Sequence, residues 1–164
     1  MIPRFRLLAE RIRNELSTLD QVVARAEGAL SRTAGQQEDS VYFISAAALD
    51  LHGFYAGLER LFELITGDVD ESRPTGSQWH RNLLAQMALA IPDLRPPVIS
   101  NETRDALQEY LEFRHVVRNV YTFNLREERV IELVRGLRRS YDLVRRDLLA
   151  FAQFLDELST ADED

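Results

Sequence analysis

The sequence contains no lysine and no cysteine, and each absence excludes a class of chemistry. All 20 basic residues are Arg, so a Schiff-base lysine and a phosphate-loop lysine are both excluded. Without cysteine there is no thiolate nucleophile, disulfide, thiolate zinc site or iron–sulfur cluster. No apolar run approaches the roughly 20 residues that span a bilayer. We therefore expect a cytoplasmic protein with no membrane association and none of these cofactors.

The length and the charge distribution limit the organisation of the chain. Its 164 residues suit one domain, which we expect over residues 1–158, followed by an acidic, frayed tail at 159–164. The net charge of −7 argues against wholesale wrapping of nucleic acid. Residues 104–146 nevertheless hold ten Arg and seven acidic residues. Any contact with RNA is therefore expected within this stretch.

Apolar residues recur every three or four positions along most of the chain, which predicts an all-α fold. We expect Gly67 to stop the second helix and Ser100 to cap the fourth. Gly53 and Gly57, four residues apart, indicate close packing of the second helix. The pattern predicts an up-and-down bundle of four or five helices. The helices are expected over about residues 4–31, 41–66, 77–91, 101–121 and 127–158.

The fourth predicted helix carries arginines beside apolar residues. At about 100° per residue, Arg114, Arg118 and Tyr121 lie within roughly 60° of one another. Leu107 and Leu111 share this stripe, which suggests a surface covered by a second subunit. The core face is predicted about a quarter turn away, at Phe113, Val116, Val117 and Val120. Alternatively, the two arginines are ordinary surface charges that pair with nearby acidic residues.

Residues 114–121 read Arg-His-Val-Val-Arg-Asn-Val-Tyr and resemble the motif of HEPN-domain proteins. The wider resemblance, to the HepT-like branch, spans about residues 38–155 and includes Trp79-His80. In that motif an Arg, a polar residue, three variable residues, a His, one further residue and a Tyr lie on a late helix. Arg114 and Tyr121 occupy the motif Arg and Tyr. Asn119 occupies the position of the His, and His115 that of the polar residue.

This resemblance implies an all-helical homodimer whose paired motifs face each other across a cleft. Family members of the toxin type are metal-independent endoribonucleases of toxin–antitoxin pairs. Their partner is a small, ATP-using nucleotidyltransferase antitoxin that can adenylylate a Tyr, here Tyr121. The resemblance implies that Arg114, His115 and Asn119 carry out catalysis on RNA, either tRNA or mRNA. It also implies that Arg118 and Tyr121 bind the substrate.

The exchange of His and Asn leaves the activity open. Cleavage of RNA by its own 2′-hydroxyl needs proton transfer, which a His performs near pH 7 and an Asn does not. Either His115 transfers the protons, or each cleft takes residues from both subunits. Otherwise the protein is a noncatalytic HEPN module that binds RNA, a nucleotide or a nucleotidyltransferase. A third hypothesis is a helical bundle in which His52, His80 and His115 bind one metal.

Three acidic or basic residues are candidates for supporting the motif. Glu59 and Arg60 of the second predicted helix could contact it, although a surface ion pair is the alternative. Glu112 precedes His115 with the Glu-x-x-His spacing of di-iron bundles. No second Glu-x-x-His occurs in the chain, so we assign Glu112 a supporting role only.

Overall fold

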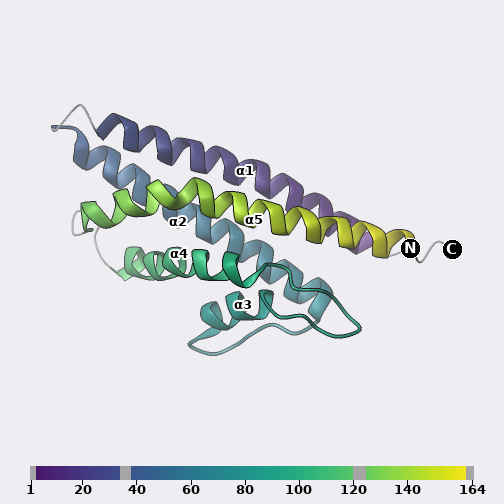
Figure 1. Cartoon of the computed structure of the whole chain (residues 1–164). Helices are drawn as coiled ribbons and strands as arrows, with labels where there is room; N and C mark the ends of the chain where they lie inside the picture. The colour runs from purple at the N-terminus through teal and green to yellow at the C-terminus, as the bar shows by residue number, and fades with distance from the viewer. Residues whose placement is uncertain (1–2, 34–37, 120–124, 162–164) are drawn as a thin grey trace.

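The predicted all-α class is confirmed by the computed structural model, which describes residues 3–33, 38–119 and 125–161 (Figure 1). The α-helices are α1 (Pro3–Thr33), α2 (Ser40–Ile65), α3 (Trp79–Met87), α4 (Asn101–Asn119) and α5 (Glu127–Ala161). A π-helical turn, η1 (Thr66–Asp70), follows α2 directly. No strand occurs in the described ranges, and Ile91 and Arg95 form an isolated β-bridge.

Helices α1, α2, α4 and α5 alternate in direction along one axis (Figure 1). Helix α1 packs along α2 and α5, and α4 packs against α2 and α5. The short helix α3 contacts both α2 and α4. Their apolar stripes form one core because residues three or four apart share a helix face. Fully buried members of this core include Leu8, Ile12, Leu19, Leu51, Phe54, Leu58, Phe62 and Leu148.

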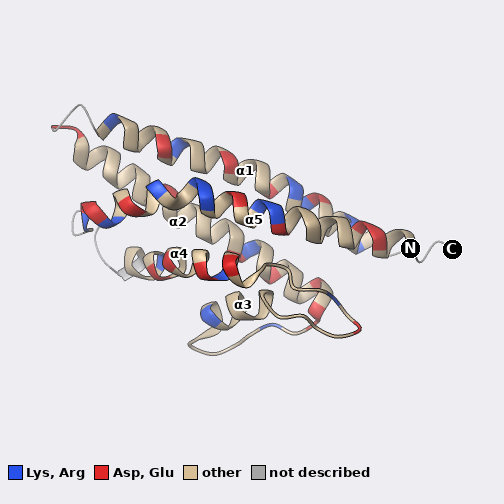
Figure 2. Ribbon diagram, in the orientation of Figure 1, with Lys and Arg blue, Asp and Glu red and all other residues tan. Residues whose placement is uncertain are grey.

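Helix α2 lies at the centre of this core and carries little charge (Figure 2). The segment Ser40–Asp70 is long and apolar enough to cross a membrane by length and composition alone. Buried core helices pass the same test, and 50% of its apolar window is buried within the molecule. Gly57 confirms the predicted close packing, because an added Cβ would lie 2.8 Å from Glu15 Oε1. At Gly53 an added Cβ would meet nothing within 4 Å.

The ends of two helices differ from the prediction. Gly67 does not stop α2, because the chain continues through η1 and turns only at Glu71, which has a φ of 52°. The guanidinium of Arg73 packs directly over Gly67, so a Cβ there would require the Arg73 side chain to shift. Helix α5 continues to Ala161, three residues beyond the expected boundary, and residues 162–164 lie outside the described ranges. Ser100 caps α4 as predicted, since its Oγ accepts the Thr103 N–H at 3.1 Å.

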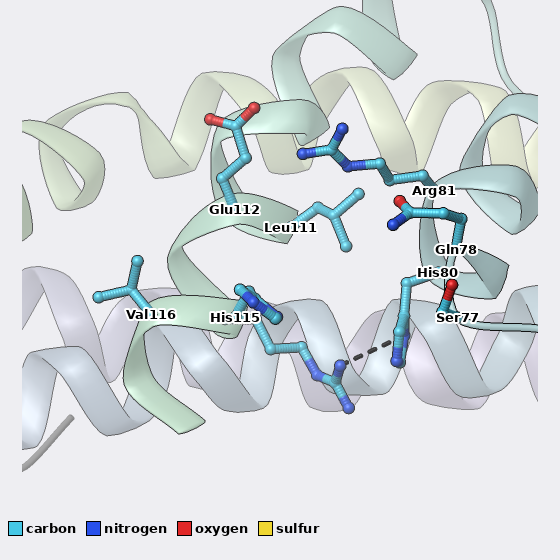
Figure 3. A pocket seen from close by; sticks show the side chains of 9 residues that line it. Ser77, Gln78, His80, Arg81, Leu111, Glu112, His115 and Val116 are labelled. Carbon is cyan, nitrogen blue, oxygen red and sulfur yellow. Dashed lines mark hydrogen bonds between the residues drawn. The ribbon is translucent and has the colours of Figure 1, made fainter. Parts of the chain in front are cut away.

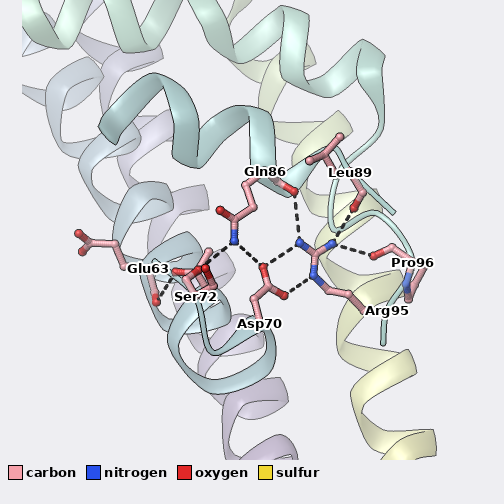
Figure 4. A network of polar contacts seen from close by, with 8 residues as sticks. Glu63, Asp70, Ser72, Gln86, Leu89, Arg95 and Pro96 are labelled. Atoms are coloured by element: carbon pink, nitrogen blue, oxygen red, sulfur yellow. Dashed lines mark hydrogen bonds and ion pairs between the residues drawn. The ribbon is translucent and has the colours of Figure 1, made fainter. Parts of the chain in front are cut away.

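A buried ion pair fastens the segment between α3 and α4 to the last residue of η1 (Figure 4). Arg95 Nε donates to Asp70 Oδ1 at 2.5 Å, and Arg95 Nη2 donates to Asp70 Oδ2 at 2.9 Å. The guanidinium also donates to the carbonyl oxygens of Gln86, Leu89 and Pro96. The two side chains are 0% and 1% exposed. The pair therefore holds α3 in place beside α4.

The orientation of α4 corrects the predicted interface. Leu107 and Leu111 are 0% and 5% exposed, so they belong to the core and do not form a surface for a second subunit. Val116, predicted to be buried, is 46% exposed. With Arg114 at zero on the helical wheel, Leu107 lies near 20° and the buried Tyr110 near −40°. Arg114 is therefore in the middle of the face that α4 turns toward α2.

Candidate functional site

Three helices each contribute one polar side chain to a cluster around a buried carboxylate. Glu59 lies in the second half of α2, His80 in the first turn of α3 and Arg114 in the last third of α4. Glu59 Oε2 lies 2.7 Å from His80 Nδ1, and Glu59 Oε1 lies 3.4 Å from Arg114 Nη2. Arg114 Nη1 lies 3.4 Å from His80 Nδ1. We call these three residues the Glu59 cluster.

Arg114 is held in this cluster but is poorly satisfied by it. Its side chain is only 15% exposed, so it is not the surface charge that the alternative interpretation expected. Both contacts of its terminal nitrogens are long, and its buried Nε has no hydrogen-bond partner among the described residues. An unsatisfied buried donor costs about 1–3 kcal/mol. Arg114 therefore retains donors that a ligand oxygen can satisfy if the side chain shifts slightly.

The buried carboxylate explains why Arg114 stays in place. Glu59 is 5% exposed, and a buried carboxylate needs a cation or hydrogen-bond donors nearby. Tyr55, one turn earlier on α2, is also buried. Burial raises the pKa of Tyr55, the nearby Glu59 charge raises it further, and the Arg114 charge lowers it. The pKa of Tyr55 is raised overall, so its phenol stays neutral and exchanges no protons near pH 7.

A pocket of about 400 Å³ lies between α3 and α4 and is lined by two members of the Glu59 cluster, His80 and Arg114 (Figure 3). Arg114, His115 and Glu112 of α4 line it, and so do His80 and Arg81 of α3. The His80 ring also stacks on the ring of Trp79, with centroids 3.6 Å apart and planes 30° apart. The lining therefore holds two arginines and two histidines against one carboxylate, with Leu111 and Val116 as apolar members. The excess of cationic groups suits anionic ligands, and the histidines can exchange protons.

The structure brings together some of the predicted site residues. Arg114, His115 and Glu112 line the pocket, and Glu59 Oε1 contacts Arg114 Nη2. Arg60 does not take part, because its Nη2 lies 3.6 Å from Glu15 Oε1 of α1. The backbones of residues 118–119 form the end of α4, but their side chains lie outside the described part of the molecule. Tyr121 lies outside it entirely.

The sequence interpretation did not recognise His80 and Arg81 as pocket residues. The only site role that the sequence suggests for His80 is that of a metal ligand together with His52 and His115. Residues 3–33, 38–119 and 125–161 contain no group of three or more His, Cys, Asp or Glu that could hold a metal. The three-histidine metal site is therefore wrong. The family resemblance, which covers Trp79-His80, is the sequence feature that could have placed His80 at the site. No rule of helical spacing links His80 to Arg114.

Ion pairs reduce the basic character of residues 104–146. Arg138 Nη1 contacts Asp20 at 2.5 Å and its Nη2 contacts Glu27 at 2.6 Å, which ties α5 to α1. Other arginines of this stretch also pair with acidic residues: Arg104 with Asp105, Arg129 with Glu109 and Glu132, Arg139 with Glu102, and Arg146 with Asp147. The stretch is therefore not one continuous basic face, and the pocket is the better candidate for binding an anion.

Comparison with known proteins shows the family of the chain. A family model described as HepT-like protein matches residues 46–155. The chain belongs to the HepT-like family. No curated protein and no solved structure matches it significantly. The matched region of this HepT-like protein begins within α2 and ends within α5, so it contains all three residues of the Glu59 cluster and the whole pocket.

Proposed function

We propose that this HepT-like protein is the ribonuclease toxin of a toxin–antitoxin pair and a metal-independent endoribonuclease. The observation that carries the proposal is one pocket lined by Arg114, His80 and His115. Arg binds phosphate oxygens through paired N–H groups and stays charged, and His exchanges protons near pH 7. These are the groups that cleavage of RNA by its own 2′-hydroxyl requires.

In the proposed reaction the 2′-oxygen forms a bond to the adjacent phosphorus, and the bond from phosphorus to the 5′-oxygen breaks. The products are a 2′,3′-cyclic phosphate and a 5′-hydroxyl. Arg114 stabilises the additional negative charge on the phosphorane, so no metal ion is needed. His115 donates the proton that the leaving 5′-oxygen requires.

The test uses wild-type protein freed of its partner and shown by mass spectrometry to carry no adenylyl group. We expect it to cleave tRNA or mRNA in EDTA, and we expect Arg114→Ala and His115→Ala to lose at least 100-fold of the rate. Arg60→Ala is the matched control, since this arginine faces Glu15 and not the pocket. Absence of cleavage by the unmodified wild type would overturn the proposal.

A second candidate is a noncatalytic HepT-like module that binds RNA, a nucleotide or a nucleotidyltransferase. It rests on Asn119, which stands where the family motif has its His. On this proposal Asn119→His creates an activity that the wild type does not have. Cleavage by the wild type in EDTA would reject it.

We further propose a homodimer and a nucleotidyltransferase antitoxin, both implied by the family. The exposed apolar side chain of Val116, on the rim of the pocket, supports the dimer, whereas the buried Leu107 and Leu111 no longer do. Light scattering at micromolar concentration should report a dimer that Val116→Glu weakens. A monomeric wild type would contradict this. Incubation with the antitoxin and ATP should add one adenylyl group at Tyr121 and lower the cleavage rate.

A further inference from the structure

Cleavage of RNA needs both a base and an acid, and one histidine cannot serve as both at the same moment. The 2′-hydroxyl must lose a proton while the 5′-oxygen gains one. The motif position that would supply a His is occupied by Asn119, so α4 offers only His115. The second proton-exchanging group must therefore come either from another helix of the same chain or from the His115 of a second copy in the proposed dimer.

The geometry around His80 determines which of its nitrogens carries the proton. The 2.7 Å contact with Glu59 Oε2 is a short hydrogen bond, so His80 Nδ1 donates its proton to the buried carboxylate. Nδ1 cannot also accept a hydrogen bond from Arg114 Nη1, which lies farther away at 3.4 Å. In the neutral ring, the lone pair is then on Nε2.

The surroundings hold this ring in one orientation. On one side Glu59 fixes Nδ1, and the stacked Trp79 restricts rotation of the ring. No described residue forms a hydrogen bond with Nε2, and His80 lines the pocket together with Arg114 and His115. A carboxylate that orients a histidine and fixes its tautomer is the arrangement that activates a general base in other hydrolases.

We propose that His80 is the general base of the cleavage reaction and that Glu59 is its positioning residue. This assignment rests on the proposed ribonuclease function. His80 Nε2 takes the proton from the 2′-hydroxyl as the 2′-oxygen attacks phosphorus. His115 gives its proton to the 5′-oxygen as that bond breaks. At the end of the step His80 carries one proton more and His115 one proton fewer than at the start. Exchange with solvent then restores the starting protonation of both histidines. Helix α3 thus supplies the histidine that the motif on α4 lacks.

The first test compares His80→Asn and His80→Ala with the wild type on an end-labelled oligoribonucleotide in EDTA. The amide of Asn is placed to donate to Glu59 as Nδ1 does, but Asn has no equivalent of Nε2. We expect both variants to cleave at least about 100-fold more slowly. Binding is measured with the same oligonucleotide carrying a 2′-deoxy sugar at the cleavage position. The Kd of both variants should be within about threefold of the wild-type Kd, since the general base acts only in the reaction. Added imidazole should restore part of the activity of His80→Ala.

The second test concerns Glu59 and separates positioning from folding. In Glu59→Gln the side-chain amide can donate to Nδ1, which favours the opposite tautomer and removes the lone pair from Nε2. We expect kcat to fall at least tenfold with KM nearly unchanged. Glu63→Gln is the matched control, because this carboxylate lies one turn later on α2, beside a different pocket.

The outcomes distinguish the two levels of the proposal. If the wild type cleaves RNA and His80→Asn cleaves it at a rate within about threefold of the wild-type rate, His80 is not the general base. The ribonuclease function would then still stand. If both His80 variants no longer bind the 2′-deoxy oligonucleotide, His80 binds the substrate and is not the general base. No cleavage by unmodified wild type would overturn the ribonuclease function and the His80 assignment together.

Discussion

The buried ion pair between Asp70 and Arg95 predicts a large loss of stability when its carboxylate is neutralised. In Asp70→Asn the shape of the side chain is kept, but the guanidinium of Arg95 keeps its charge in a site where its side chain is 0% exposed. Removing one partner of a buried pair costs about 3–5 kcal/mol, because the remaining charge is left without its counterion. The carbonyl oxygens of Gln86, Leu89 and Pro96 still accept its hydrogen bonds but carry no net charge.

This free energy has measurable consequences in urea and on heating. With a denaturant slope of roughly 2 kcal/mol per molar urea, the midpoint should fall by about 1.5–2.5 M. At about 2–4 °C per kcal/mol for a chain of this size, Tm should fall by about 6–20 °C. Both quantities can be followed by far-ultraviolet circular dichroism, since the fold is all helical.

The matched control is Asp105→Asn. Asp105 pairs with Arg104 on the surface, where the two side chains are 71% and 38% exposed, and such pairs contribute about 0–1 kcal/mol. We expect this variant to unfold within about 0.5 kcal/mol of the wild type. A loss below about 1 kcal/mol in Asp70→Asn would refute the reasoning, because it would mean that the carboxylate does not compensate the buried charge.

Two further predictions concern other buried polar groups. The hydroxyl of Tyr141 donates to the Leu16 carbonyl oxygen at 2.7 Å. Tyr141→Phe should therefore lower the free energy of unfolding, measured by urea titration, by about 1 kcal/mol. An unchanged free energy of unfolding would contradict this. Burial raises the pKa of Asp147, but hydrogen bonds from Ser100 N and Thr103 Oγ1 outweigh it and leave the pKa below 3.8. The stability that Asp147 contributes is therefore present above pH 3.8 and is lost as pH falls below it. In Asp147→Asn the free energy of unfolding should therefore decrease less with falling pH over this range than it does in the wild type.

Much of the fold could be predicted because it depends on local spacing. A repeat of apolar residues every three or four positions is a property of one helix, and it located α1, α2 and α5 to within a few residues. The cap at Ser100 is likewise local. The end of α2 could not be predicted from Gly67, because the chain continues as the π-helical turn η1 and reverses only at Glu71.

The site was only partly predictable for a physical reason. Helical spacing shows which residues share a face, but it does not show which face is buried. Arg114 was identified by its motif, and it was the packing of α4 on α2 that turned it toward Glu59. His80 lies 21 residues from Glu59 in the sequence, and only the return of α3 against α2 and α4 makes them hydrogen-bonded neighbours.

The sequence by itself determined the helical class, the family motif and the chemistry that its side chains permit. With no Lys and no Cys, the chain offers arginines and histidines for binding anions and exchanging protons, and Arg114 and His115 lie on one helix. The tertiary structure decided which groups meet. Burial makes an unpaired carboxylate costly, so Glu59 of α2 holds both Arg114 and His80. These two residues line the pocket between α3 and α4, and α2 thereby fixes the pocket without lining it.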